Sequence, residues 1–282
     1  MSFMRVARRC GACLLGAAAL MAVTASPAAA QDAPDDDKKI ATVTGGLDFV
    51  NRYMFRGIRQ NSEGLAIWPY IDLGLGAYSG DGSLKSVAVN FGMWNSTHTD
   101  PSSWYEADYY ATLGLGLGGG TALGMTYTSY TSPDDLFTHV KELAFKFTVD
   151  DSGAFGRGSM KPYVLVAFEM GTDEHTGQAD GGLEAGKYLE FGIAPGYSAT
   201  KASLAIPMKV GLSLGDYYEH PETGEDSTFG YFSIGAIVTV PIGPHFNIHG
   251  GGEFQALGDT TEFFNGGEST RGIGSIGIGF SF

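Results

Sequence analysis

The sequence contains only two cysteines, Cys10 and Cys13, and both precede an apolar stretch near its start. It is also short of basic residues, with 17 Lys and Arg against 31 Asp and Glu and a formal net charge of −14. An acidic surface of this kind repels nucleic acid and attracts cations. The sequence has no Cys or His spacing typical of a metal site, no glycine-rich phosphate loop and no basic patch. We therefore expect no cofactor and no nucleic-acid partner, and we assign no metal site.

Long apolar runs are also missing, because after residue 30 none approaches the roughly 20 residues of a membrane-spanning helix. The start of the chain is different, since arginines precede an apolar stretch over 14–23 and small residues follow it. This order predicts a secretory signal peptide over 1–30, cleaved after Ala30. Both cysteines leave with it, so we expect no disulfide in the mature chain. The remainder divides into an acidic periplasmic segment over 31–39 and one domain over 40–282.

Glycine and aromatic residues, in contrast, are abundant. The 43 glycines are about double the average share of roughly 7%, and an aromatic content of 12% argues against disorder. From residue 40 onward, apolar residues alternate with small or polar ones in twelve segments that show almost no helical period. These segments cover 40–55, 65–79, 84–95, 104–117, 121–131, 139–149, 160–170, 187–199, 203–218, 228–240, 246–257 and 272–282.

The alternation separates two faces of each segment. In 228–240, Phe232 and Ile234 share one face, while Ser233 and Gly235 share the other. A soluble β-sandwich alternates too, but its strands usually run about 5 or 6 residues, whereas a strand that crosses a bilayer needs about 9 to 11. The length and number of the segments predict an all-β fold, a single transmembrane up-and-down antiparallel β-barrel of about 12 strands.

The connectors alternate in length, as expected for a closed barrel with tight periplasmic turns and larger outer loops. The short connectors are 79–83, 118–120, 200–202 and 242–245, and the long ones are 56–64, 96–103, 132–138, 171–186, 219–227 and 258–271. The connector over 150–159 breaks this rule, and we interpret it as an enlarged turn. Because the strand number is even, both chain ends lie on one side. We therefore predict an outer-membrane location with periplasmic N and C termini.

The chain ends in SIGIGFSF, in which Phe280 and Phe282 lie on the apolar face of the last segment. This strand must close against the first, because an open sheet edge is not viable in hydrocarbon. The two phenylalanines resemble the C-terminal assembly signal of outer-membrane barrels, so we expect the barrel assembly machinery, outer-membrane lipid and lipopolysaccharide as partners. Aromatic girdles are expected at both membrane boundaries, with Phe147, Tyr197 and Phe246 in the inner girdle and Tyr105, Phe168, Tyr218 and Phe254 in the outer one.

A resemblance to a known family covers roughly 40–150. The residues that carry it are Tyr53, Arg56, Gly57 and Gln60 in NRYMFRGIRQN, Trp94 and Asn95 in GMWNS, Glu106, Asp108 and Tyr110 in EADYYATLG, Tyr127, Tyr130 and Pro133 in YTSYTSP, and Glu142. On these motifs the chain resembles the TorF family of outer-membrane porins. The resemblance implies a barrel fold and a transport function, and it names no substrate.

Where the apolar face meets lipid, the opposite face lines the lumen, and its charged residues are pore-lining candidates. They are Asp48, Arg52, Arg56, Asp72, Glu106, Asp108, Glu142, Lys146, Lys161, Glu169, Glu190, Lys209 and Glu253. A charged lumen selects among ions and solutes, and acidic outer loops concentrate cations. We predict a porin-like channel for passive diffusion of small hydrophilic solutes or ions, biased to cations. The same charges can instead pair across strands and stiffen a narrow barrel, so an open lumen does not follow.

Two alternatives belong to other functional classes. In the first, the barrel does not conduct and its acidic loops bind divalent cations or a partner, although GTDEHTGQADGGLE lacks the ligand spacing of a calcium loop. The second is an outer-membrane hydrolase, which needs a nucleophile and a base within reach of each other. Four histidines, His98, His139, His175 and His220, lie in different loops, and no short motif links them to a serine or carboxylate. We therefore predict no enzymatic activity and assign no catalytic residue.

Overall fold

A computed structural model describes residues 41–61, 63–152, 158–170 and 184–282. The predicted signal peptide, the acidic segment and most of the 171–186 connector lie outside these residues. The described chain is mainly β-strand, with one α-helix, α1 (Asp259–Phe264), and one short 3-10 helix, η1 (Gly118–Gly120). Within the described residues, no helix has both the length and the apolar character needed to cross a membrane.

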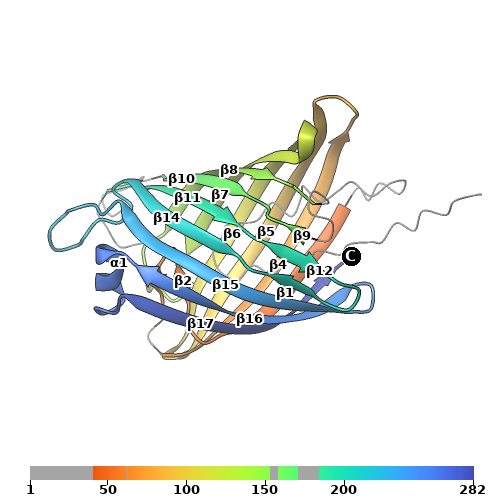
Figure 1. Cartoon of the computed structure of the whole chain (residues 1–282). Coiled ribbons are helices and arrows are strands. Elements are labelled where there is room, and N and C mark those ends of the chain that lie inside the picture. Colours follow the sequence, from red (N-terminus) through yellow and green to blue (C-terminus); the bar gives the residue numbers. More distant parts are fainter. Residues whose placement is uncertain (1–40, 62, 153–157, 171–183) are drawn as a thin grey trace, which may run out of the picture.

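Twelve strands form one closed antiparallel barrel, as predicted (Figure 1). The continuous strands are β1 (Ala41–Val50), β4 (Glu63–Ser79), β5 (Leu84–Asp100), β6 (Ser102–Leu117), β7 (Thr121–Thr131), β8 (Val140–Val149), β15 (Phe229–Ile242), β16 (Phe246–Leu257) and β17 (Thr270–Ser281). The other strands each consist of two pieces, namely β9 (Gly158–Ser159) with β10 (Tyr163–Glu169), β11 (Lys187–Ile193) with β12 (Gly196–Ser198), and β13 (Ser203–Ala205) with β14 (Met208–Gly215).

Prolines divide the three interrupted strands. Pro162, Pro195 and Pro207 stand in the gaps between the pieces, and a proline has no N–H to donate to the ladder. The pairing register between the first two of these strands is the same on both sides of the gap. Each two-piece unit is therefore one strand of the barrel.

The first and last strands close the barrel. β1 pairs antiparallel with β17, with Leu47 opposite Ile278, and the other strands pair with their neighbours in chain order. Closure pairs the first strand with the last, which would otherwise present open edges to hydrocarbon. This confirms the predicted pairing and accounts for the alternating apolar residues of β17.

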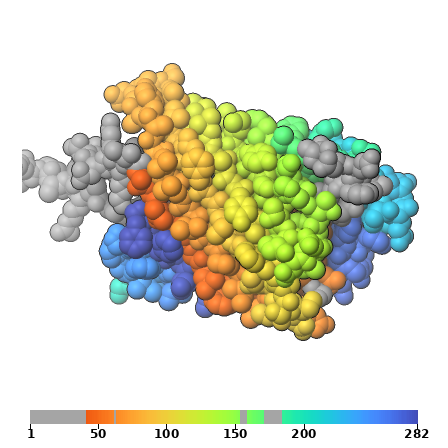
Figure 2. All heavy atoms as spheres, turned by 180° about the vertical axis from the view of Figure 1, so that it is seen from behind, coloured from red at the N-terminus to blue at the C-terminus, as the bar shows by residue number. Residues whose placement is uncertain are grey.

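The outer wall of the barrel is apolar and the inner face is polar. On β15, Phe232 and Ile234 are 39% and 37% exposed, whereas Ser233 between them is 2% exposed. Large exposed apolar side chains occur around the wall, from Phe91 on β5 to Ile276 on β17. Figure 2 shows one side of this wall, formed by the orange to green strands β4 to β8. An apolar outer surface on a closed barrel is the face that lipid covers, so the barrel is a transmembrane one.

Short turns and long loops lie at opposite ends of the barrel. The C terminus lies at the short-turn end and α1 at the other, and we call these the terminal end and the loop end (Figure 1). The predicted connector over 96–103 is wrong, because β5 and β6 continue through it and only Pro101 separates them. The β-branched Thr97 and Thr99 continue the ladder there.

Two residues that were predicted for the outer girdle lie inside the barrel instead, so those two predictions are wrong. Tyr218 is fully buried because the loop after β14 folds into the barrel, and Tyr105 donates a hydrogen bond to Gln60 inside it. Tyr105 is the extra residue of a bulge in β6, opposite the step from Ser96 to Thr97 on β5, and this places its side chain on the inner face. The remaining predicted aromatics are 39% to 53% exposed on the outer wall, namely Phe147, Phe168, Tyr197, Phe246, Phe254 and Phe282.

Candidate functional site

Residues 51–61 fold into the barrel as a hairpin, which we call the inner hairpin. Its two short strands are β2 (Met54–Phe55) and β3 (Ile58–Arg59). The two-residue turn between them consists of Arg56, with a φ of 48°, and Gly57, with a φ of 85°. Both angles lie in the left-handed region that a type I′ hairpin turn requires.

The tip of the inner hairpin carries a buried ion pair. Nη1 of Arg56 lies 2.6 Å from Oε2 of Glu142, and Nη2 lies 2.9 Å from Oε1. The two side chains are 0% and 3% exposed. The guanidinium also donates to the hydroxyl of Tyr217 at 2.9 Å and lies 4.1 Å from the ring centre of Tyr188. Two-point pairing and a cation–π contact offset part of the cost of burying these charges, so the pair fixes the position of the tip.

Two loop residues also hold the backbone of the tip. The hydroxyl of Tyr218 donates to the carbonyl of Arg56 at 2.9 Å, and the side-chain amide of Asn265 donates to the carbonyl of Gly57 at 2.8 Å. Both turn carbonyls are therefore paired, as buried backbone groups generally are.

The inner hairpin crosses the lumen near the loop end. At its base, Tyr53 donates to Glu106 at 2.8 Å, and Tyr105 donates to Gln60 at 2.6 Å. The hairpin starts from β1, and its tip contacts β8 and β11, which lie across the barrel from β1 in strand order. The predicted outer loop over 56–64 is therefore wrong, because its first residues are inside the barrel.

Two carboxyl groups of β6 stand at the base of the inner hairpin. Glu106 and Asp108 are 5% and 0% exposed. Glu106 accepts the hydrogen bond from Tyr53, and its carboxyl group also interacts with that of Asp108. Burying two neighbouring carboxyl groups is costly unless they share a proton or a cation. Glu106 and Asp108 together are therefore a candidate contact for a cation that enters the lumen.

A fourth buried carboxyl group, that of Glu190, gathers tyrosine hydroxyls. Glu190 on β11 accepts hydrogen bonds from Tyr163, Tyr188 and Tyr231 at 2.6, 2.6 and 2.9 Å. Two lysines approach the same cluster, since Lys146 lies 4.2 Å from the ring centre of Tyr163 and Lys209 lies 5.7 Å from that of Tyr231. Cation–π and hydrogen-bond contacts thus bring residues of five strands, β8, β10, β11, β14 and β15, together inside the barrel.

Three further pore-lining candidates have inward partners on the same or a nearby strand. The pairs are Asp48 with His249 at 2.7 Å, Asp72 with Tyr110 at 2.9 Å and Glu253 with Gln255 at 2.7 Å. These contacts are of the cross-strand or same-face kind that stabilises sheets.

The last three candidates lie apart from these clusters. Arg52 donates to the carbonyl of Gly272 at 3.1 Å, and Glu169 accepts from the backbone N–H of Gly186 at 2.9 Å. Lys161 lies in the gap between β9 and β10. For all the charged candidates, a pore-lining role remains a prediction.

Sequence analysis missed several residues that hold the inner hairpin. Tyr217 and Asn265 lie in the loops after β14 and α1, where no period-two pattern exists to say which way a side chain points. An aromatic residue in a polar loop was the only available signal, and it is weak because loops carry many exposed aromatics.

The structure places His98 differently from the prediction and His139 in a loop, as predicted. His98 lies within β5 instead of a loop, 4.5 Å from the ring centre of Tyr105. His139 precedes β8, and its Nε2 lies 2.7 Å from Oγ of Ser129 on β7. This pair is on the outer wall, away from the inner hairpin. His175 lies outside the described residues.

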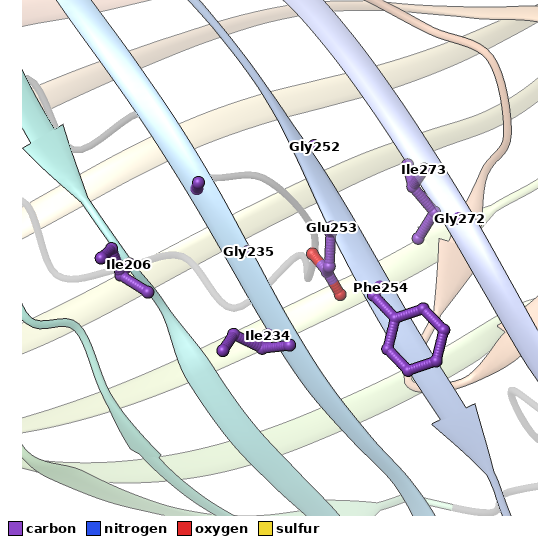
Figure 3. A pocket seen from close by; sticks show the side chains of 9 residues that line it. Ile206, Ile234, Gly235, Gly252, Glu253, Phe254, Gly272 and Ile273 are labelled. Atoms are coloured by element: carbon purple, nitrogen blue, oxygen red, sulfur yellow. The ribbon is translucent and has the colours of Figure 1, made fainter.

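A groove of about 580 Å³ lies in the wall near β14, β15, β16 and β17. Figure 3 shows Ile206, Ile234 and Phe254 beside it and labels Gly235, Gly252 and Gly272 among the residues that line it. The glycines create the hollow, because they lack the side chains that fill the wall elsewhere.

No family model and no curated protein sequence matches the chain. Solved structures with a similar barrel include the NanC porin (TM-score 0.47, 10% identity, 85% of this chain and 98% of that chain). They also include outer membrane phospholipase A from Escherichia coli (TM-score 0.46, 13% identity, 85% of this chain and 89% of that chain). A third is the translocator domain of the autotransporter NalP from Neisseria meningitidis (TM-score 0.41, 15% identity, 88% of this chain and 90% of that chain). At these identities none of the likenesses assigns a function to this chain.

Proposed function

We propose that this chain is an outer-membrane channel of the porin type, in which the inner hairpin forms the constriction. The observation that carries the proposal is the hairpin itself, a charged segment held across the lumen of a barrel whose outer face meets lipid. Small hydrophilic solutes or ions pass between the hairpin and the polar wall. In porin-like channels, such a ring of charged side chains sets selectivity.

The resemblance to the TorF family supports this proposal. Tyr53, Arg56 and Gly57, which belong to its opening motif, form the inner hairpin, and Glu106 and Glu142 from later motifs bind it. Residues scattered over the resembling region therefore meet at one place in the lumen.

The proposed selectivity is a preference for cations. The inner hairpin carries three arginines, Arg52, Arg56 and Arg59, and three carboxyl groups stand around it, but over all the charged pore-lining candidates eight are acidic and five are basic. A narrow passage lined with more negative than positive charge raises the local concentration of cations. We also propose that the terminal end faces the periplasm, so that the constriction lies in the outer half of the membrane.

The test is a recording from the refolded mature protein in a planar bilayer under a salt gradient. We expect discrete conductance steps and a cation-sided reversal potential. Replacing residues 53–60 with a short Gly-Ser linker should enlarge each step, while the same linker in place of the exposed turn 79–83 should not.

One observation favours a second candidate, a barrel that does not conduct. Met54, Arg56 and Tyr231 are at most 1% exposed, so packing around the hairpin is tight. A wild-type protein that inserts as a folded barrel and never conducts would replace the channel with this second candidate.

A further inference from the structure

Ser129 and His139 form a hydrogen-bonded pair on the outer wall. Ser129 lies on β7, His139 directly precedes β8, and Oγ of the serine is 2.7 Å from Nε2 of the histidine. The histidine is exposed and the serine half-buried. This is the distance at which an imidazole base can take the proton of a serine hydroxyl. Ten positions separate them in the chain, so the sequence pattern did not connect them.

The pair stands where the apolar face of β7 ends. Leu123, Met125 and Tyr127 point outward along this strand and are 36% to 40% exposed, and Ser129 is the next outward residue. Its neighbour across the sheet is Tyr109, which is 50% exposed. Outward aromatics of this kind mark the boundary between hydrocarbon and head groups. The hydroxyl of Ser129 is therefore at the depth where membrane lipids carry their ester bonds.

A positive charge accompanies the pair. Lys141 on β8 is the other cross-strand neighbour of Ser129, and the alternation of β8 places it on the outer face. Desolvation and the charge of Lys141 lower the pKa of His139 below its ordinary value. A neutral imidazole is the form that accepts a proton. The ammonium of Lys141 can also face the phosphate of a lipid or the oxyanion that forms during ester attack.

We propose that Ser129 and His139 are a nucleophile and base that hydrolyse the acyl ester of a membrane glycerophospholipid. The acyl chain lies along Leu123 and Met125, with the ester at Ser129 and the phosphate toward Lys141. This activity is separate from the channel, because the pair faces lipid and the inner hairpin faces the lumen.

The reaction takes two steps and consumes one water. Oγ of Ser129 attacks the ester carbonyl carbon while Nε2 of His139 takes the hydroxyl proton. The bond to the glycerol oxygen then breaks, and the imidazolium gives its proton to that oxygen, which leaves the fatty acyl group on Ser129. In the second step water attacks the acyl carbon as His139 takes its proton. The bond to Oγ breaks, Oγ receives the proton, and a fatty acid is released.

The test uses the full refolded protein with a fluorescent alkyl fluorophosphonate and with detergent micelles that contain phosphatidylethanolamine. We expect covalent labelling, and peptide mass spectrometry should place the label on Ser129. We also expect release of fatty acid, which Ser129→Ala and His139→Ala should each lower by at least about 100-fold, the usual scale of general-base catalysis.

Matched controls separate this activity from a contaminant. Ser103→Ala and His220→Ala change another half-buried serine and another loop histidine and should keep full activity. Heat-modifiable migration on gels reports folding of each variant. Labelling of wild-type protein elsewhere than Ser129, no fatty-acid release by folded wild-type protein, or full activity in Ser129→Ala would each overturn the proposal.

Discussion

The guanidinium of Arg56 meets the carboxylate of Glu142 through two hydrogen bonds, of 2.6 and 2.9 Å, inside the barrel near its loop end. Arg56 is the tip of the inner hairpin and Glu142 belongs to β8 on the far wall. This one contact joins two sides of the lumen, so its removal tests both the stability of the barrel and the position of the hairpin.

Glu142→Gln should destabilise the folded barrel. The substitution leaves the buried guanidinium of Arg56 without its counter-charge, a loss that typically costs about 3 to 5 kcal/mol. The double variant Arg56→Met with Glu142→Leu should lose less stability than Glu142→Gln, because neither charge of the pair then stays buried without its partner. Denaturant unfolding in lipid vesicles, with the free energy of unfolding as the readout, checks this. Equal losses in the single and double variants would show that the pair does not act as a unit.

Gly57→Ala should destabilise the inner hairpin by about 1 to 2 kcal/mol from backbone conformation alone, because its φ of 85° is unfavourable for an L residue. Close packing adds to this, since the new Cβ would lie 3.0 Å from Cβ of Tyr231. Gly119→Ala is the matched control, because Gly119 has a φ of 75° but open space around its Cβ position. Denaturant unfolding should show a larger loss of unfolding free energy in Gly57→Ala than in Gly119→Ala, and the difference reports the contact with Tyr231. Equal losses in the two variants would contradict a role for that contact.

Asp108→Asn should reduce the cation preference of the channel. The substitution removes an ionisable carboxyl group beside the inner hairpin with little change in shape. Reversal potentials under a salt gradient should move toward zero. Asp81→Asn, which neutralises an exposed residue in the 79–83 turn, should leave the potential unchanged. An unaltered potential in Asp108→Asn would mean that ions do not pass this carboxyl group.

Asp151 should make the turn after β8 sensitive to acid. Slight desolvation raises the pKa of its carboxyl group, but hydrogen bonds from the backbone N–H groups of Lys161 and Met160 outweigh it and hold the pKa below its ordinary value. A lowered folded-state pKa contributes stability above the unfolded pKa, and this contribution is lost as the pH falls through the folded pKa.

Amide hydrogen exchange checks this turn. Protection of the Met160 and Lys161 amides should fall as the solution is acidified, and Asp151→Asn should abolish that pH dependence. Asp150→Asn is the control, since its carboxylate accepts from Ser152 instead. If acid lowers the protection of these amides as much in Asp151→Asn as in the wild-type protein, the carboxylate of Asp151 is not the cause.

Much of the fold could be predicted because a strand repeats every two residues. The alternation of Phe232, Ser233 and Ile234 already separates the lipid face from the inner face, and twelve such segments of sufficient length require a closed barrel in a membrane. The predictions failed where this period is interrupted. The register irregularity near Thr97 turns Tyr105 inward, and the threonines after Ser96 extend β5 through a stretch whose polarity resembles a loop.

The sequence by itself determined the number of strands, their closure and the face that meets lipid, since these follow from neighbours two positions apart. Only the tertiary structure decided that residues 51–61 turn into the lumen and that Arg56 meets Glu142, 86 positions away. It alone brought Ser129 to His139 on the outer wall. The physical reason is that pairing across a lumen or across a strand connection depends on distances in space, and a local repeat carries no information about them.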